Sequence, residues 1–225
     1  MINALPKALS GIGYYQGLSL ILWIIAVIIL FVNASLFLFR GLKVERDVKK
    51  GYLAWSIFSL LYAVCRIFYL IAVHISQYYD LFASIGYIFG ISSLISILYL
   101  IESQIFTSTK KFFTIITTVA FGISLLSLLD LSNRYFTLIL LSIIGVFSSL
   151  LIVFMYLYLV FKTRDTARRK AFMIFIAVIF ILISHFIDSP MFITVFPLVP
   201  LEVPPILMIF GLFLLLYANL FYKLD

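Results

Sequence analysis

Long uncharged apolar runs, separated by short clusters of lysine and arginine, most constrain how this 225-residue chain can fold. A bilayer core of about 30 Å is crossed by about 20 apolar residues at a helical rise of ~1.5 Å each. Cutting the chain at charges and turn residues leaves seven such runs: 17–40, 51–76, 81–106, 112–129, 135–161, 171–188 and 204–222. We therefore predict an all-α membrane protein, a single seven-helix transmembrane domain over residues 1–225.

The composition supports this class and argues against others. Hydrophobic residues make up 65% of the chain and charged residues 11%, with a mean hydropathy of +1.23, whereas about a quarter of a soluble domain is charged. The single cysteine, Cys65, excludes a disulfide framework. The net charge of +7 lies in short runs beside apolar segments, which indicates membrane topology rather than nucleic-acid binding. We expect the lipid bilayer as a partner, and neither a metal nor a cofactor.

The basic residues predict the orientation, because cytoplasmic loops retain positive charge. With the amino terminus outside, thirteen of the sixteen lysines and arginines fall on the inner side: Arg40, Lys43, Arg46, Lys49, Lys50, Lys110, Lys111, Lys162, Arg164, Arg168, Arg169, Lys170 and Lys223. We therefore expect an outside amino terminus, an inside carboxyl terminus and a location in the cell membrane. The first run is longer than a signal-peptide core, so we expect no cleaved signal.

Small residues indicate where helices approach closely. Run 81–106 carries Ala83, Gly86, Gly90 and Ser93 at spacings of three and four, a pattern that lets helix backbones meet in lipid. We interpret it as a packing seam within the bundle. The alternative is a homo-oligomer formed through Gly86 and Gly90.

Arg66 is the most informative polar residue. It lies sixteen residues beyond Lys50, about 24 Å along a helix, and a charge near the bilayer centre costs about 2.5–3.5 kcal/mol on insertion scales. Ser59, Tyr62, Arg66 and Tyr69 recur at spacings of three and four, so they form one stripe that we expect to face the interior. Tyr62, Arg66 and Tyr69 are candidate ligand-binding residues.

Three further polar residues reach a similar height by the same count from the inner basic clusters: His185, Asp188 and Asp130. If their helices turn polar faces inward, they line one outer cavity with Arg66. Two interpretations stay open. Arg66 forms a structural ion pair with Asp188 or Asp130, or it recognises an anionic ligand, because guanidinium binds carboxylates and phosphates in bidentate fashion.

Glu102, near the inner end of run 81–106, is the second polar group inside the predicted spans, with Lys110 and Lys111 just beyond it. One interpretation is a carboxylate that reaches the interface and pairs with a loop lysine. The other is an inner latch at Glu102, Lys110 and Lys111, in which the carboxylate holds Arg46, Lys50 or Lys170 in one state and releases it in another.

Five of the six prolines fall within residues 190–205, interleaved with apolar side chains. Proline interrupts a helix, yet the segment is too apolar for a solvated loop. We expect either an interfacial crossover or a lid over the outer cavity.

Catalytic motifs are absent. No lysine lies inside a predicted run, which excludes a retinal Schiff base, and H-E-x-x-H, D-x-x-D, G-x-S-x-G and glycine-rich phosphate loops do not occur. We therefore expect no enzymatic activity.

Two motifs carry a resemblance to known proteins. An arginine stands two-thirds along the second run, in Tyr62-Ala63-Val64-Cys65-Arg66, and the third run ends with an acid and then lysines, from Leu100-Ile101-Glu102 through Thr109-Lys110-Lys111. In these motifs, and in topology along most of its length, the chain resembles seven-span receptor-like proteins of prokaryotes, particularly archaea, and the membrane sensor halves of some histidine kinases. The resemblance implies a receptor or sensor role.

Three functional hypotheses follow. The first is a seven-helix receptor or sensor that binds a small anionic or amphiphilic ligand in an outward-facing pocket and signals through a separate cytoplasmic protein at the basic inner loops. The second is a small transporter, because the inner loops after the first and fifth runs are similar and hint at a three-plus-one-plus-three repeat. The third is a non-catalytic membrane subunit or scaffold.

Overall fold

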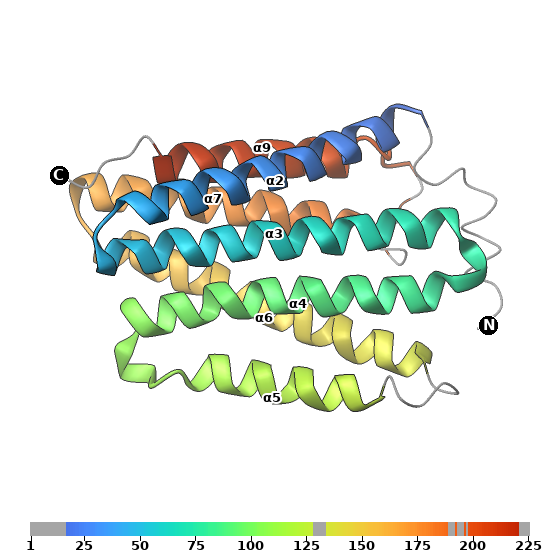
Figure 1. The fold of residues 1–225 in the computed structure, drawn as a ribbon, viewed down its shortest axis with the longest axis horizontal. Coiled ribbons are helices and arrows are strands. Elements are labelled where there is room, and N and C mark those ends of the chain that lie inside the picture. The colour runs from blue at the N-terminus through green and yellow to red at the C-terminus, as the bar shows by residue number, and fades with distance from the viewer. Residues whose placement is uncertain (1–16, 128–133, 189–191, 193–195, 197, 221–225) are drawn as a thin grey trace. The chain divides into compact units, whose positions relative to one another are not determined.

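The computed structural model describes residues 17–127, 134–188, 192, 196 and 198–220, and their regular structure is helical (Figure 1). The helices are α2 (Leu18–Lys43), α3 (Arg46–His74), α4 (Tyr79–Gln104), α5 (Phe112–Ser127), α6 (Arg134–Lys162), α7 (Asp165–Ile187) and α9 (Val203–Leu220), with single 3-10 turns η1 (Ser76–Tyr78) and η2 (Thr107–Thr109). Each predicted run coincides with one of these helices.

Two helices, α3 and α7, begin five and six residues earlier than predicted. The second run was expected to start at residue 51 and the sixth at residue 171, but α3 starts at Arg46 and α7 at Asp165. Charged residues were taken as boundaries, yet lysine and arginine are good helix formers once they lie outside the lipid. The basic clusters therefore form the first turns of these helices instead of loops.

Within the described residues, six helices are long and apolar enough to cross a membrane: α2, α3, α4, α6, α7 and α9. Helix α5 is apolar but shorter, with 16 residues, roughly 24 Å at the helical rise. The described chain is therefore an all-helical protein with several membrane-spanning helices.

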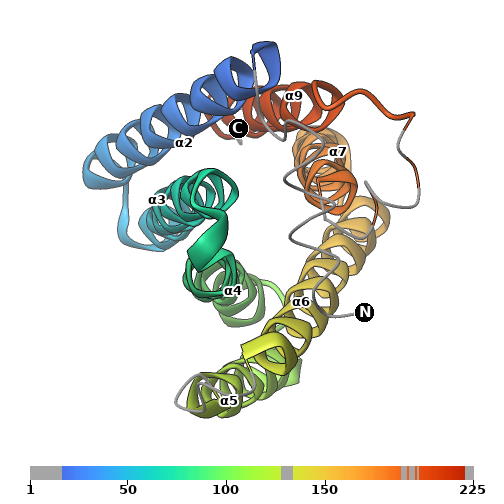
Figure 2. The ribbon, with the colours of Figure 1, turned by 90° about the vertical axis from the view of Figure 1, so that its right-hand side faces the viewer.

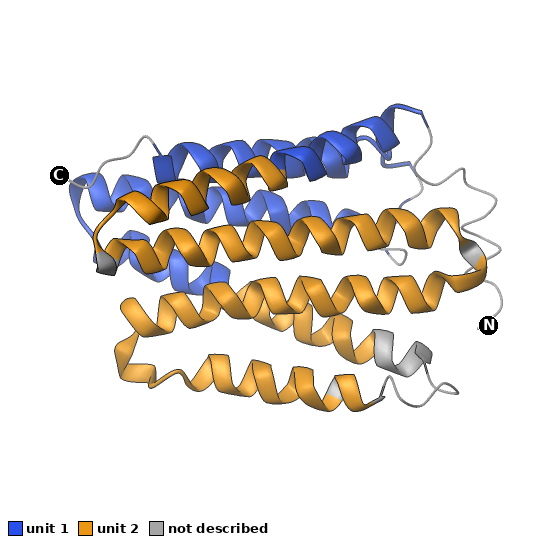
Figure 3. Ribbon diagram, viewed as in Figure 1, with its two compact units in different colours: residues 1–29, 152–225 blue, residues 30–151 orange. Residues whose placement is uncertain are grey.

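The chain divides into two compact units (Figure 3): residues 1–29 with 152–225, and residues 30–151. We call them unit 1 and unit 2. Both boundaries lie inside helices, α2 and α6, so each unit contains part of these two helices. The single domain expected from the sequence stays a prediction.

In unit 2, α3 and α4 lie side by side (Figures 1 and 2). Gly86 and Gly90 of α4 form the predicted packing seam. A Cβ atom at Gly86 would lie 3.1 Å from Cδ2 of Tyr69, and one at Gly90 would lie 3.2 Å from Sγ of Cys65. These glycines thus serve the contact with α3 inside the chain, and the homo-oligomer that we considered at them stays an untested alternative.

In unit 1, α7 and α9 pack through another glycine. A Cβ atom at Gly211 would lie 2.9 Å from the carbonyl oxygen of Ala177. Near the carboxyl-terminal end of α7, the Ser184 hydroxyl donates a 2.7 Å hydrogen bond to the carbonyl of Pro204, in the first turn of α9. A close backbone contact and a hydrogen bond between helices therefore hold this pair together.

Candidate functional site: the Arg66 cluster and the Glu102 cap

Arg66 lies on α3 inside unit 2 and is only 2% exposed. Its Nη2 donates a 3.2 Å hydrogen bond to the Tyr62 hydroxyl, one helical turn earlier. The guanidinium carbon lies 5.4 Å from the centre of the Tyr62 ring and 5.8 Å from that of Tyr69, within the range of cation–π attraction. Tyr62, Arg66 and Tyr69 therefore form one cluster, which we call the Arg66 cluster.

The cluster continues an aromatic column along the same face of α3. Trp55 and Phe58 are buried; their ring centres lie 5.5 Å apart, and the Phe58 ring stacks on that of Tyr62 at 5.6 Å. Spacings of three and four residues place these side chains above one another on a helix. Tyr62, Arg66 and Tyr69 are all buried, as expected for an interior stripe.

Helix α4 positions Tyr69 from the other side. The Tyr69 ring lies against Gly86 and makes an edge-on contact with Tyr87, with ring centres 5.4 Å apart. The sequence indicated the glycine seam and the polar stripe as two separate features. It did not indicate that Gly86 leaves the space for a ring that flanks Arg66, because spacing within each helix says nothing about the rotation of one helix against another.

His185 and Asp188 belong to unit 1. His185 lies in the last turn of α7 and is half-buried, while Asp188 is the buried carboxyl-terminal cap of that helix, its N–H bonded to the Ser184 carbonyl at 3.0 Å. His185 and Asp188 therefore lie together at the end of α7 in unit 1, whereas Arg66 belongs to unit 2. Asp130 lies outside the described residues, so the predicted shared cavity stays a prediction.

Glu102 is buried, with 1% of its surface exposed, near the end of α4. Its Oε1 accepts a 3.1 Å hydrogen bond from the Phe113 N–H, and Oε2 accepts bonds from the Thr114 N–H at 2.6 Å and the Thr114 hydroxyl at 2.5 Å. The first N–H groups of a helix have no intrahelical acceptor and carry partial positive charge. Glu102 therefore caps the start of α5.

This cap differs from the expected pairing. We expected Glu102 to pair with a loop lysine or to act as a latch on a basic loop residue. In the described part of the chain, it bonds to the start of α5 rather than to Lys110 or Lys111. Two N–H donors and a hydroxyl suit a buried carboxylate better than one mobile ammonium. Lys111 instead lies over the Tyr99 ring, with Nζ 4.6 Å from the ring centre.

Residues 190, 191, 193–195 and 197 of the proline-rich segment lie outside the described residues, and so does the amino-terminal stretch for which we expected no cleaved signal. Two described rings from the segment, Phe192 and Phe196, have centres 4.7 Å apart, and Phe192 also contacts Phe186 of α7. Leu198 is 94% exposed. The crossover and the lid both stay predictions.

No group of three or more histidine, cysteine, aspartate or glutamate side chains gathers in the described residues in a way that could hold a metal ion. Comparison with known proteins gives no matching family model, no matching curated protein and no matching solved structure. The long apolar helices of the described residues define the class: this is a multi-pass helical membrane protein.

Proposed function

We propose that the protein is a seven-helix receptor or sensor of the cell membrane, in which Arg66 binds a small anionic or amphiphilic ligand. The observation that supports this most is the Arg66 cluster. Tyr62 and Tyr69 orient the guanidinium through a hydrogen bond and two ring contacts. A carboxylate or phosphate that reaches it gains a charge-assisted, bidentate interaction in a medium of low dielectric.

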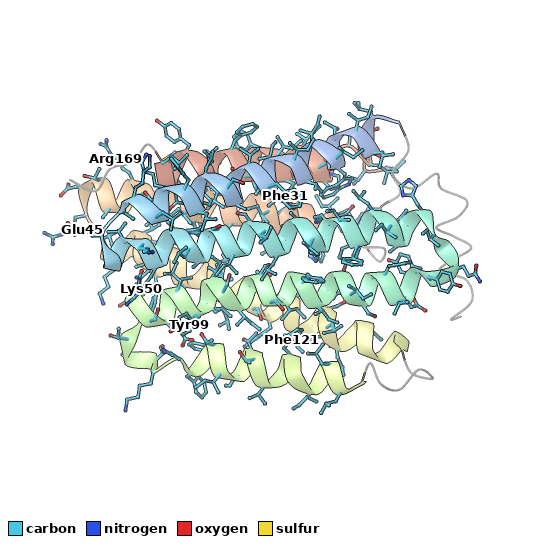
Figure 4. The ribbon with its side chains drawn as sticks, viewed as in Figure 1. Phe31, Glu45, Lys50, Tyr99, Phe121 and Arg169 are labelled. Atoms are coloured by element: carbon cyan, nitrogen blue, oxygen red, sulfur yellow. The ribbon has the colours of Figure 1, made fainter. Side chains whose placement is uncertain are left out.

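In this proposal α5 also crosses the membrane, which brings the number of spans to seven, and the amino terminus lies outside. In unit 2, the connections between α2 and α3 and between α4 and α5 lie at one end, where Glu45, Lys50 and Tyr99 are seen in Figure 4. The lysines of these connections would then lie inside the cell. Ligand binding would act through a separate cytoplasmic protein that contacts the basic loops.

A ligand can only signal by binding one arrangement of the helices better than another. The Arg66 cluster supports such a difference, because Tyr69 contacts both Arg66 on its own helix and Gly86 on α4. A ligand that draws the guanidinium away from the Tyr69 ring would loosen this contact and change how α3 packs on α4. We propose this as the first step of signal transfer.

A binding experiment tests the proposal. The purified protein in detergent is heated with a panel of short carboxylates, phosphate monoesters and fatty acids, and its melting temperature is measured. We expect a saturable increase with at least one compound, lost in Arg66→Ala and weakened in Tyr62→Phe, which keeps the ring but removes the hydroxyl. Arg169→Ala, a change at an exposed arginine of α7, should leave the increase unaltered.

Two results would contradict the proposal. One is an increase of the same size in Arg66→Ala, and the other is no increase with any compound of the panel. Accumulation of a panel compound inside proteoliposomes would favour the transporter instead. A stoichiometric protein partner that co-purifies equally well with the wild type and with Arg66→Ala, without ligand, would favour the scaffold.

A further inference from the structure

The turn between α4 and α5 presents two positive charges and no exposed acid. Lys110 and Lys111 are exposed, as are Thr107 and Ser108 just before them. The carboxylate nearest in sequence, Glu102, is buried and engaged with the start of α5. The charges of both lysines therefore face the surroundings of the turn instead of being neutralised by Glu102.

The backbone holds these two lysines in an unusual conformation. Lys110 and Lys111 have φ angles of 48° and 64°, in the left-handed region that residues with a Cβ atom seldom adopt. Directly after these residues, the N–H groups of Phe113 and Thr114 bond to Glu102, and the Lys111 carbonyl accepts a 2.9 Å bond from the Ile115 N–H. Strain of this kind is often found at binding sites.

Tyr99 indicates the level of the turn relative to the membrane. It is half exposed on α4, and its hydroxyl lies 3.5 Å from Lys111 Nζ, which also rests over the ring. Tyrosine at the end of an apolar span is typical of the boundary between acyl chains and headgroups. The lysine is thus held at the level where lipid phosphates lie.

Apolar groups complete the surroundings. Ile105 and Phe112, on either side of the turn, are exposed. A ligand bound here would meet ammonium and hydroxyl donors at one end and apolar side chains at the other. That division suits an amphiphile whose anionic head carries a phosphate.

We propose that Lys110 and Lys111, positioned by Glu102 and Tyr99, bind the headgroup phosphate of an anionic phospholipid. Lysine binds phosphate as a point charge, and clusters of basic residues beside a span attract anionic lipid. The inference is independent of the receptor proposal, because it uses the α4–α5 turn and neither Arg66 nor a signalling partner. Inorganic phosphate carries the same anionic group as the lipid headgroup but has no acyl chains that could contact Ile105 and Phe112.

The test measures binding of phosphatidylglycerol to the full chain in a neutral detergent, by native mass spectrometry or by the rise in melting temperature. Phosphatidylcholine and inorganic phosphate serve as the other ligands. The variant is Lys110→Gln with Lys111→Gln. The matched control is Lys43→Gln with Lys162→Gln, which removes two charges that also rest on exposed aromatic rings, Phe39 and Tyr158.

We expect phosphatidylglycerol to bind more tightly than the other two ligands. Its affinity should fall roughly ten-fold or more in the Lys110/Lys111 variant, because each lysine near an anionic lipid contributes several-fold. The control should stay within about two-fold of the wild type, and Lys110→Arg with Lys111→Arg should retain binding. Thermal melting without lipid shows that each variant is folded, and the arginine variant tests the role of charge with the backbone least disturbed.

Three outcomes would overturn the inference. The first is an equal loss of affinity in the control, which would mean a diffuse basic surface. The second is equal binding of phosphatidylcholine. The third is binding of inorganic phosphate as tight as that of the lipid, which would assign the turn to a soluble anion.

Discussion

The hydroxyl and the backbone N–H of Thr114 both donate to one carboxylate oxygen of Glu102, at 2.5 and 2.6 Å. An acid of α4 thus supplies the cap of α5 from twelve residues away in sequence. Removing it leaves two N–H groups at the start of α5 without that acceptor. Since a buried donor left unsatisfied costs about 1–3 kcal/mol, we expect Glu102→Ala to lower the free energy of unfolding by about 2–4 kcal/mol.

Glu102→Gln keeps one acceptor oxygen and should lose only about 1 kcal/mol. Glu45→Ala is the control, because Glu45 precedes α3 and makes no side-chain capping bond. Thermal or denaturant unfolding in detergent compares the three variants. A similar loss of unfolding free energy in Glu45→Ala and Glu102→Ala would show that the Glu102 cap does not stabilise the protein.

Gly86 and Gly122 provide a test of the α3–α4 seam. A Cβ atom at Gly86 would come within 3.1 and 3.2 Å of two Tyr69 ring atoms, whereas one at Gly122 on α5 would meet nothing within 4 Å. We expect Gly86→Ala to cost about 1–3 kcal/mol by overpacking and Gly122→Ala to be neutral or to stabilise by up to about 1 kcal/mol. Melting temperatures measure both. Equal effects would contradict a tight contact at Gly86.

Gly211 should tolerate substitution least. Its added Cβ atom would lie 2.9 Å from a backbone oxygen, that of Ala177, which moves only if α7 and α9 separate. We expect Gly211→Ala to lower the folded yield and the melting temperature more than Gly86→Ala does, because a ring edge can turn aside more easily than a helix backbone. Gly51→Ala is the control, since nothing lies within 4 Å there.

The bond from Ser184 to Pro204 joins two helices, whereas the bond from Ser35 to Phe31 lies within one. Hydrogen bonds between helices in membranes contribute on average about 0.6 kcal/mol. We therefore expect Ser184→Ala to lose about 0.5–1.5 kcal/mol and Ser35→Ala, at an exposed site, to lose almost nothing. Unfolding curves of the two variants measure these losses. An equal loss of stability in both would argue against a role of the Ser184 hydroxyl in joining α7 to α9.

Tyr62→Phe probes the Arg66 cluster while it leaves the ring in place. The Tyr62 hydroxyl accepts a bond from a guanidinium, and bonds to charged groups contribute about 1.5–3 kcal/mol. We expect a loss in that range from Tyr62→Phe and less than about 0.5 kcal/mol from Tyr78→Phe, whose exposed ring makes an edge-on contact with Phe82. Unchanged stability in Tyr62→Phe would mean that the hydroxyl does not orient Arg66.

Local chemistry was sufficient to predict the helices. The apolar run 81–106 coincides with α4 to within two residues at each end, because insertion of a helix into lipid depends on the hydrophobicity of that segment alone. The starts of α3 and α7 were predicted too late because charge ends a span but not a helix. The stripe through Arg66 also followed from local spacing, since residues three and four apart share a helix face.

The partners of the polar side chains did not follow from the sequence. The positions of Glu102, Lys110 and Lys111 are equally compatible with a lysine pairing and with a cap on α5. The choice depends on how α5 meets α4 and on the left-handed turn between them.

The sequence by itself determined that this chain crosses membranes as helices, because each apolar segment satisfies its own backbone hydrogen bonds in lipid. Only the tertiary structure decided that Gly86 makes room for the ring beside Arg66 and that Glu102 caps α5. Lipid provides no apolar drive that would specify the rotation of each helix. That rotation, and with it the partners of Glu102 and Ser184, is set by close packing and hydrogen bonds between residues far apart in the chain.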